Sequence, residues 1–216
     1  SNQIATLHPG VRNLQALRYL SIEHNVLTSV IPNVGKLTEL RVLRLTGNQL
    51  SQIPATIGNL GQLRELYLAH NKLEAVPTAI GGLTSLNLLA LEDNKLNELP
   101  PETGFLTNLT TLSLVGNVIH NLPLEIGNLE LLRVMSVDDA KLQTPPKEVV
   151  MKGTTAMMEY LRKVSHSRHS RLLDLSCMGL WNFPKEIARL KYLTSLSLTG
   201  NVIGTLGPEI AELTGL

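Results

Sequence analysis

The sequence predicts an α/β solenoid, in which short parallel strands alternate with irregular outer segments along the chain. Three regularities predict it: a recurrent asparagine, alternating leucines just before it, and proline and glycine at fixed positions after it. The asparagine recurs every 23 residues, at Asn2, Asn25, Asn48, Asn71, Asn94 and Asn117, and the register returns at Asn201. A fixed period of this length indicates stacked supersecondary units, none of which can bury its apolar face alone.

The strand of each repeat is expected in the Leu-x-Leu pair before the asparagine, for example Leu66 and Leu68. Alternation with a period of two places both leucines on one face of a strand. Because the repeats share one register, their strands should pair as a parallel sheet with a spacing of about 4.8 Å. Eight strand segments are expected, beginning at Leu17, Leu40, Leu63, Leu86, Leu109, Leu132, Ser170 and Leu193.

The asparagine is expected to end each strand and to satisfy backbone groups in its own turn and in the adjacent coil, because its amide both donates and accepts. The outer segment then carries apolar anchors, such as Ile53, Ile57 and Leu60. Prolines recur there at Pro54, Pro77, Pro100, Pro123 and Pro184. Their fixed φ favours an extended path or a short turn over a long helix.

The frame of residues 63–83 reads L-x-x-L-x-L-x-x-N-x-L followed by V-P-x-x-I-G-x-L, and its equivalents cover almost the whole chain. It resembles the leucine-rich repeat of the 23-residue intracellular type. It is similar to Ras-binding leucine-rich-repeat scaffolds, plant intracellular Ras-group proteins and the repeat regions of ROCO GTPases. The resemblance implies a right-handed solenoid with a parallel sheet on its concave face and an irregular, proline-rich convex side. It also implies recognition of proteins through the sheet, with catalysis in separate attached domains.

The composition favours no other class of partner. The net charge is +1 and aromatic residues make up 3% of the chain, which gives neither a general attraction for nucleic acid nor many stacking platforms for single strands. No segment approaches the roughly 18 apolar residues of a membrane span, and the first residues lack the layout of a signal peptide. Cys177 is the only cysteine, so no disulfide can form within the chain and a cytoplasmic location is expected. Neither end shows the polar cap of a solenoid, so we expect a slice of a longer protein.

The repeat is interrupted between Leu142 and Leu173, which predicts three segments. Residues 1–144 form a first sub-array and residues 170–216 a second. Residues 145–169 between them form an inserted amphipathic helix and a polar linker, since apolar residues from Val149 to Val164 recur at helical spacing. The insertion is either a tolerated addition to the outer side or a hinge or docking element. Ser165, after Arg162 and Lys163, is a candidate for phosphorylation in an exposed linker.

Residues between the strand leucines should point out of the concave face, where they form columns across the strands. Candidate partner-binding residues in the first repeats are Tyr19, His24, Arg44, Tyr67 and His70, of which Tyr19, Arg44, Tyr67 and His70 form an aromatic and basic cluster. An acidic stretch follows at Glu92, Asp93, Asp138, Asp139 and Asp174. Such a bipolar face suits a partner with the opposite order of charges. An ordinary solvated surface is the alternative interpretation of any single residue.

We expect no enzyme activity, cofactor, metal or small-molecule substrate. The chain has no phosphate-binding glycine loop and no G-x-S-x-G motif, and no histidine shares the coil of Cys177. His24 and His70 should lie two strands, or roughly 10 Å, apart, which is too wide for a shared zinc ion. The sequence therefore predicts a non-catalytic protein-interaction scaffold, with a function in small-GTPase or related signalling as the finer expectation. The alternative is the recognition segment of a larger enzyme, such as a ROCO-type GTPase, kinase, phosphatase or ubiquitin ligase.

Overall fold

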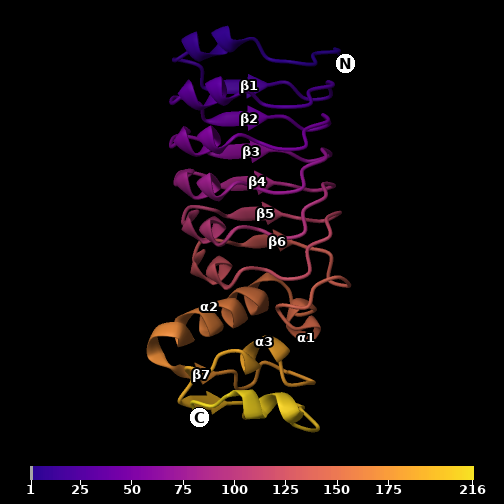
Figure 1. The fold of residues 1–216 in the computed structure, drawn as a ribbon, viewed down its shortest axis with the longest axis vertical. Helices are drawn as coiled ribbons and strands as arrows, with labels where there is room; N and C mark the ends of the chain where they lie inside the picture. Colours follow the sequence, from indigo (N-terminus) through magenta and orange to yellow (C-terminus); the bar gives the residue numbers. More distant parts are fainter. Residues whose placement is uncertain (1) are drawn as a thin grey trace. The chain divides into compact units, whose positions relative to one another are not determined.

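The computed structural model describes residues 2–216, and the strands of the first sheet lie in sequence order (Figure 1). A six-stranded parallel sheet contains β1 (Tyr19–Ser21), β2 (Val42–Arg44), β3 (Glu65–Tyr67), β4 (Leu88–Ala90), β5 (Thr111–Ser113) and β6 (Val134–Ser136). A two-stranded parallel sheet contains β7 (Leu172–Asp174) and β8 (Ser195–Ser197). Leu20 pairs with Leu43, and Leu43 with Leu66, so partners are one 23-residue period apart. The eight expected strands are confirmed, and so is the register within each sheet, but the strands form two sheets where a single one was expected.

The leucines of the repeat frame form the core. Leu43, Leu66 and Leu89 are at most 1% exposed, and the outer anchors Ile57 and Leu60 are at most 2% exposed. Because each strand is only three residues long, no single repeat encloses its own leucines. The stacking of neighbouring repeats buries them, as the sequence predicts.

The asparagine of each repeat bridges two neighbouring coils. Asn94 donates through Nδ2 to the carbonyl oxygens of Leu68 and Leu91, both at 3.0 Å, and its Oδ1 accepts from the backbone N–H of Leu73 at 2.9 Å. Asn71 and Asn48 make the same contacts one and two repeats earlier. Each unsatisfied buried group would cost about 1–3 kcal/mol, so this ladder holds the turns in register. The predicted role of the asparagine is confirmed.

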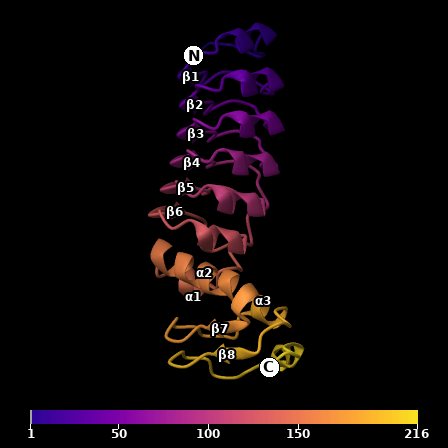
Figure 2. The same cartoon turned by 90° about the vertical axis from the view of Figure 1, so that its left-hand side faces the viewer.

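The outer segments form short 3₁₀ helices, on the side opposite the strands in the first repeats (Figure 2). They are η1 (Pro9–Asn13), η2 (Pro32–Lys36), η3 (Ala55–Asn59), η4 (Thr78–Gly82), η5 (Pro101–Phe105), η6 (Leu124–Asn128) and η7 (Pro208–Glu212). Pro54 precedes η3 with φ of −70°, and the helix ends after one turn. A Cβ atom at Gly58 would collide with the carbonyl oxygen of Ala79, so glycine at this position allows adjacent helices to stack closely.

The chain divides into two compact units. The first runs to Ile119 and includes Asn128–Asp138, and the second contains His120–Gly127 and Asp139–Leu216. The first unit contains the six-stranded sheet, and the second contains the two-stranded sheet and the α-helices.

The insertion contains two helices where the sequence predicts one, and this prediction is corrected. α1 spans Lys147–Val150 and α2 spans Thr154–Ser170, and Gly153 between them has φ of 88°. This backbone conformation is open to glycine and breaks the helix. The expected apolar face is present in α2, where Met157, Tyr160, Leu161 and Val164 are buried. A third helix, α3 (Lys185–Ala188), follows β7.

The predicted polar linker at residues 165–169 is also wrong, because these residues form the last turns of α2. Ser165 is 9% exposed and Ser167 is fully buried, where its hydroxyl donates to the carbonyl oxygen of Val164 at 2.7 Å. Arg168 pairs with Glu125 of the same unit at 2.6 Å. A kinase needs an accessible hydroxyl, so the folded chain does not present Ser165 as a phosphorylation site.

Candidate functional site

The candidate site lies on the sheet face of the first unit, where the strand register brings side chains of successive repeats into columns. One column contains Ser21, Arg44, Tyr67, Ala90, Ser113 and Ser136, and the column before it contains Tyr19, Val42, Glu65, Leu88, Thr111 and Val134. Residues that are 23 positions apart in the sequence are thus adjacent on one surface. The predicted columns within this sheet are confirmed, and their use in binding stays a prediction.

Arg44 lies between two tyrosine rings. Its Cζ atom is 4.6 Å from the ring centroid of Tyr67 and 5.9 Å from that of Tyr19, both within the range of cation–π attraction. The Nε atom of Arg44 is buried and has no hydrogen-bond acceptor among the described residues. Tyr19 is 53% exposed, although it is a large aromatic side chain. The cluster therefore combines exposed aromatic surface with an unused donor.

Tyr67 is held on its other side by Glu65. Its hydroxyl donates to Oε2 of Glu65 at 2.9 Å. Burial raises the pKa of Tyr67, and the hydrogen bond to the Glu65 carboxylate raises it further. The ring is therefore neutral at physiological pH, and its position is fixed by contacts within β2 and β3. This rigidity lowers the entropic cost of binding at an aromatic anchor.

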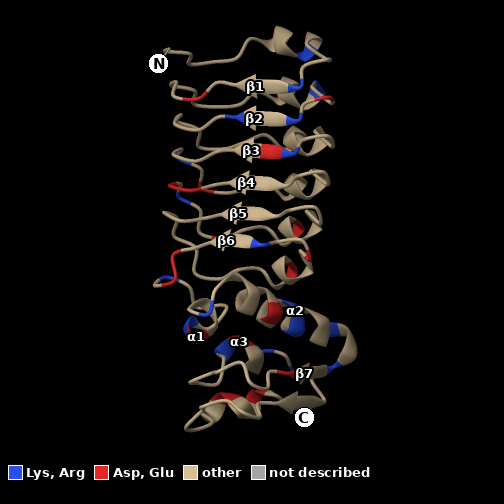
Figure 3. Cartoon of the chain, turned by 180° about the vertical axis from the view of Figure 1, so that it is seen from behind, with Lys and Arg blue, Asp and Glu red and all other residues tan. Residues whose placement is uncertain are grey.

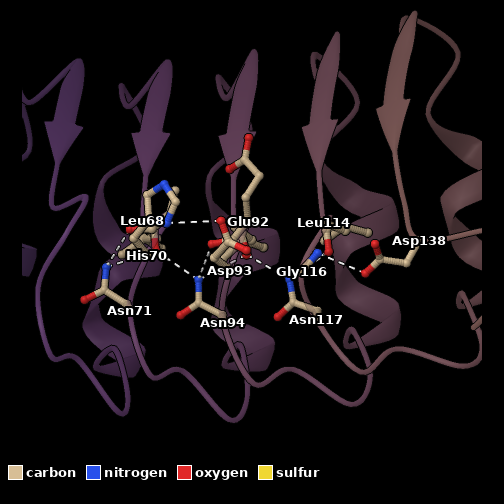
Figure 4. Close-up of polar contacts among 12 residues, drawn as sticks. Leu68, His70, Asn71, Glu92, Asp93, Asn94, Leu114, Gly116, Asn117 and Asp138 are labelled. Atoms are coloured by element: carbon tan, nitrogen blue, oxygen red, sulfur yellow. Dashed lines mark hydrogen bonds and ion pairs between the residues drawn. The ribbon is translucent and has the colours of Figure 1, made fainter.

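His70 does not join the tyrosine and arginine cluster. It pairs instead with Asp93 of the next repeat, with 3.1 Å between Nδ1 and Oδ2 (Figure 4). The side chains are 61% and 55% exposed, so the pair contributes little to stability. The contact joins two groups that the sequence places in separate basic and acidic clusters.

His24, His70 and Asp93 share a backbone conformation as well as a column. Their φ angles are 54°, 54° and 50°, in the left-handed region that histidine and aspartate tolerate better than most residues. Each immediately precedes the ladder asparagine or its equivalent, at the turn that ends the strand. The turn alone thus favours these residue types, and sequence analysis missed this second explanation.

A groove of about 480 Å³ opens over β3, β4 and β5. Its base includes the small residues Ala69 and Ala90, which are less than 10% exposed, and Tyr67 stands at its side. The small side chain of Ala90 follows Arg44 and Tyr67 in the same column, so the surface is hollowed at this strand. The lining also includes Glu92, whose Oε2 atom is buried and accepts no hydrogen bond from the described residues.

The acidic residues divide between the two units. In the first unit, Oδ2 of Asp138 accepts from the backbone N–H of Gly116 at 2.9 Å (Figure 4). In the second unit, Asp139 is exposed, and Oδ1 of Asp174 accepts from the backbone N–H of Ser176 at 2.9 Å. Hydrogen bonds from Ser176 lower the pKa of Asp174, so it carries its charge at neutral pH. Asp138 and Asp174 thus also stabilise local turns.

The sequence analysis overlooked a column of arginines. Arg18, Arg41 and Arg64 directly precede β1, β2 and β3, and Figure 3 shows basic residues at this end of the three strands. The backbone N–H of Arg41 donates to the carbonyl oxygen of Arg18, and that of Arg64 to Arg41, both at 2.8 Å. Among residues 2–216 none of the three guanidinium groups has an ion-pair partner. Because these arginines are 23 residues apart in the sequence, the repeat period alone could have predicted that they form a column.

The second unit has a hollow of about 660 Å³ beside α1 and α3. Glu148 and Glu186 line it, and the hydroxyl of Tyr160 donates to Oε1 of Glu186 at 2.7 Å. Burial raises the pKa of Glu186 and, more strongly, that of Tyr160. Oε1 of Glu148 accepts from the backbone N–H of Trp181 at 2.7 Å, so this carboxylate fixes a loop. These contacts give Tyr160, Glu186 and Glu148 a structural role.

No catalytic or metal-binding constellation emerges within the described part of the chain. It contains no group of three or more histidine, cysteine or acidic residues that could hold a metal ion. Cys177 is an exposed free thiol with φ of 58°, and its Sγ lies beside Gly200. Across residues 2–216, no helix has the length and apolar character that a bilayer crossing needs.

The family follows from this repeat geometry and from direct comparison. A model of the leucine-rich repeat region matches residues 5–91 and 57–150. The chain therefore belongs to the leucine-rich repeat family. Proteins with this fold commonly bind other proteins, and the α/β solenoid class is confirmed. The comparison with curated proteins gave no match.

Solved structures with the same fold come from bacteria and plants. A leucine-rich-repeat protein of Leptospira interrogans is 31% identical with a TM-score of 0.54, and the alignment covers 100% of this chain and 57% of that one. The ectodomain of the Arabidopsis thaliana membrane receptor kinase GASSHO1/SCHENGEN3, solved with CASPARIAN STRIP INTEGRITY FACTOR 2, is 26% identical with a TM-score of 0.59, covering 96% and 21%. An internalin of Listeria monocytogenes, 20% identical with a TM-score of 0.55, covers 98% and 49% and is similar in fold alone. The chain thus spans between about a fifth and three fifths of the length of these proteins.

Proposed function

We propose that the protein is a non-catalytic interaction scaffold that binds a partner protein on the sheet face of its first unit. The partner class that we propose is an intracellular signalling protein, such as a small GTPase. The resemblance of the repeat frame to the intracellular type supports this choice. The single cysteine, exposed as a free thiol, suits a reducing compartment and therefore a cytoplasmic location.

The arrangement of Tyr19, Arg44 and Tyr67 carries the proposal. Tyrosine and arginine are enriched among the residues that dominate binding energy, and here they are stacked on each other before any partner arrives. The fold does not require Arg44 or Tyr67, since serine or alanine occupies their column in other strands. The Nε atom of Arg44 is buried and makes no hydrogen bond to the described residues, so the side chain is not held by a polar contact of that atom.

Affinity capture followed by quantitative mass spectrometry tests the proposal on the full-length protein. The Arg44→Ala/Tyr67→Ala double variant should reduce recovery of its specific partner about tenfold or more, because truncation of a hot-spot residue commonly costs at least about 2 kcal/mol. A Thr78→Ala/Thr84→Ala variant, altered at exposed positions of the outer side, should retain the partner. The proposal is wrong if every partner survives both the double variant and charge reversal at Asp138 and Asp139.

The second candidate is the recognition segment of a larger enzyme, such as a ROCO-type GTPase, kinase, phosphatase or ubiquitin ligase. One structure with this fold belongs to a receptor kinase, and the chain aligns with 21% of that structure's length. The two candidates differ outside these 216 residues. Nucleotide-binding or catalytic motifs in the flanking coding sequence would favour the enzyme, and further repeats alone would favour the scaffold.

A further inference from the structure

We propose that the groove over β3, β4 and β5 receives a basic side chain, lysine or arginine, of the partner protein. The inference rests on the proposed function and names the chemistry that the partner must present. The groove lies next to the stacked Arg44 and Tyr67, so a protein seated on those residues also covers it.

The shape of the groove suits a long, partly apolar side chain. Ala69 and Ala90 form an apolar base, and Leu88 and Val115 add further aliphatic surface. Lysine and arginine bury their methylene stems on such surfaces and keep the charged end in a polar setting. A bulkier residue in place of Ala90 would fill the hollow, because its Cβ belongs to the outward-facing column.

The charge of the groove selects a cation. Glu92 and Asp93 are its two carboxylates and His70 is its one basic group, so the lining is acidic whether or not the imidazole is protonated. Asp93 is already paired with His70, whereas Oε2 of Glu92 is buried without a donor. A carboxylate rotates readily about its terminal torsion, so the free lone pairs of Glu92 can turn toward an incoming ammonium or guanidinium group.

The aromatic wall favours the same ligand. Tyr67 lines the groove, and its ring already attracts the guanidinium group of Arg44. A cation that enters the groove gains both the ring and the carboxylate of Glu92 as partners, whereas a neutral aliphatic chain gains the apolar base alone. An acidic side chain would meet two like charges.

Titration with Nα-acetyl-lysine amide and Nα-acetyl-arginine amide, followed by amide NMR of the full chain, tests the proposal directly. Nα-acetyl-norleucine amide is the neutral control of similar length. We expect the two cationic probes to shift the amide signals of Ala90, Glu92 and Ser113, and the norleucine probe to shift them much less. Equal shifts by all three probes, or no shift by the cationic ones, would overturn the proposal.

Two pairs of variants separate charge from shape. Glu92→Gln should weaken binding of the cationic probes by about fivefold or more, because it removes the unpaired charge, while Glu98→Gln at an exposed position should not. Ala90→Leu should abolish binding by filling the groove, while Ser21→Leu, in the same column but outside the groove, should leave it intact. Unchanged binding in both Glu92→Gln and Ala90→Leu would sink the inference.

The partner-capture experiment distinguishes this failure from failure of the proposed function. If capture is lost in Arg44→Ala/Tyr67→Ala but unchanged in Glu92→Gln and Ala90→Leu, the scaffold function stands and the basic subsite is wrong. If capture is insensitive to all of these changes, the sheet face is not the binding surface.

Discussion

At the scale of single residues, the turn after each strand explains a set of residue choices. The position before the ladder asparagine, or its equivalent, has positive φ at His24, Gly47, His70, Asp93, Gly116, Cys177 and Gly200. Glycine adopts this conformation without steric cost, and histidine and aspartate tolerate it. The conformation of the turn therefore accounts for His24, His70 and Asp93 without any role in binding.

Gly116→Ala tests how strictly the turn controls this position. The substitution should lower the free energy of unfolding by about 1–2 kcal/mol, the usual cost of a left-handed residue with a Cβ atom, and more if Asp93 cannot move. The added Cβ would collide with Oδ1 of Asp93 and lie 2.9 Å from its backbone nitrogen. Urea unfolding of the purified chain measures the change.

Gly61→Ala is the matched control, because Gly61 lies in the same unit and a Cβ atom there would meet nothing within 4 Å. Gly61→Ala should leave the free energy of unfolding unchanged or raise it by up to about 1 kcal/mol, since alanine restricts the conformations of the unfolded chain. If the two variants lose the same stability, backbone conformation does not determine the choice of glycine at Gly116.

At the scale of elements, α2 and α3 are joined through the carboxylate of Glu186, whose burial disfavours its charged form. Tyr160 of α2 donates to Glu186 of α3, but burial raises the pKa of Glu186 above its usual value of 4.5, and the charge of Glu148 raises it further. The folded state thus binds the proton of Glu186 more tightly than the unfolded state. Its contribution to stability is present below pH 4.5 and is lost as the pH rises through the folded pKa.

Glu186→Gln removes this titration and keeps an oxygen that can accept from Tyr160. Relative to wild type, the variant should therefore gain stability between pH 4 and pH 7, with the larger advantage at pH 7. Urea unfolding at both pH values measures the difference between the two proteins. Glu212→Gln, an exposed change in the same unit, should show no such trend, and an equal trend in both variants would contradict the assignment.

At the scale of the whole molecule, the first unit is a stack in which each repeat contacts its neighbours. The stability of such a stack is a sum of terms within repeats and between adjacent repeats, rather than of one central core. A destabilising substitution in a middle repeat should therefore lower the local stability of the two adjacent repeats most.

Leu66→Ala tests this local coupling, because Leu66 is fully buried in β3. The cavity should cost about 2–5 kcal/mol. Hydrogen exchange should quicken in β2 and β4 more than in β6. Leu14→Ala, at a position 52% exposed in the same unit, should change exchange little. Equal loss of protection across all six strands would show a single cooperative core instead.

The fold of the repeats could be predicted in detail, whereas the insertion could not. Leucines and asparagines at a strict period define strand, register and turn, because each repeat has the same neighbours. The insertion has no repeat period to define its elements. Apolar residues at helical spacing from Val149 to Val164 therefore predicted one continuous helix, although the helix is broken at Gly153. The polar composition of residues 165–169 likewise favoured a linker, whereas these residues are helical and both serines among them are buried.

The candidate site divides in the same way. The repeat period determined by itself that Tyr19, Arg44 and Tyr67 share one surface, because register converts a sequence interval into spatial adjacency. Only the tertiary structure decided that His70 turns to Asp93, that Ala90 leaves a groove, and that an oxygen of Glu92 is buried there without a donor. Side-chain direction and burial depend on what packs around each residue, and that packing is absent from a periodic pattern of residue types.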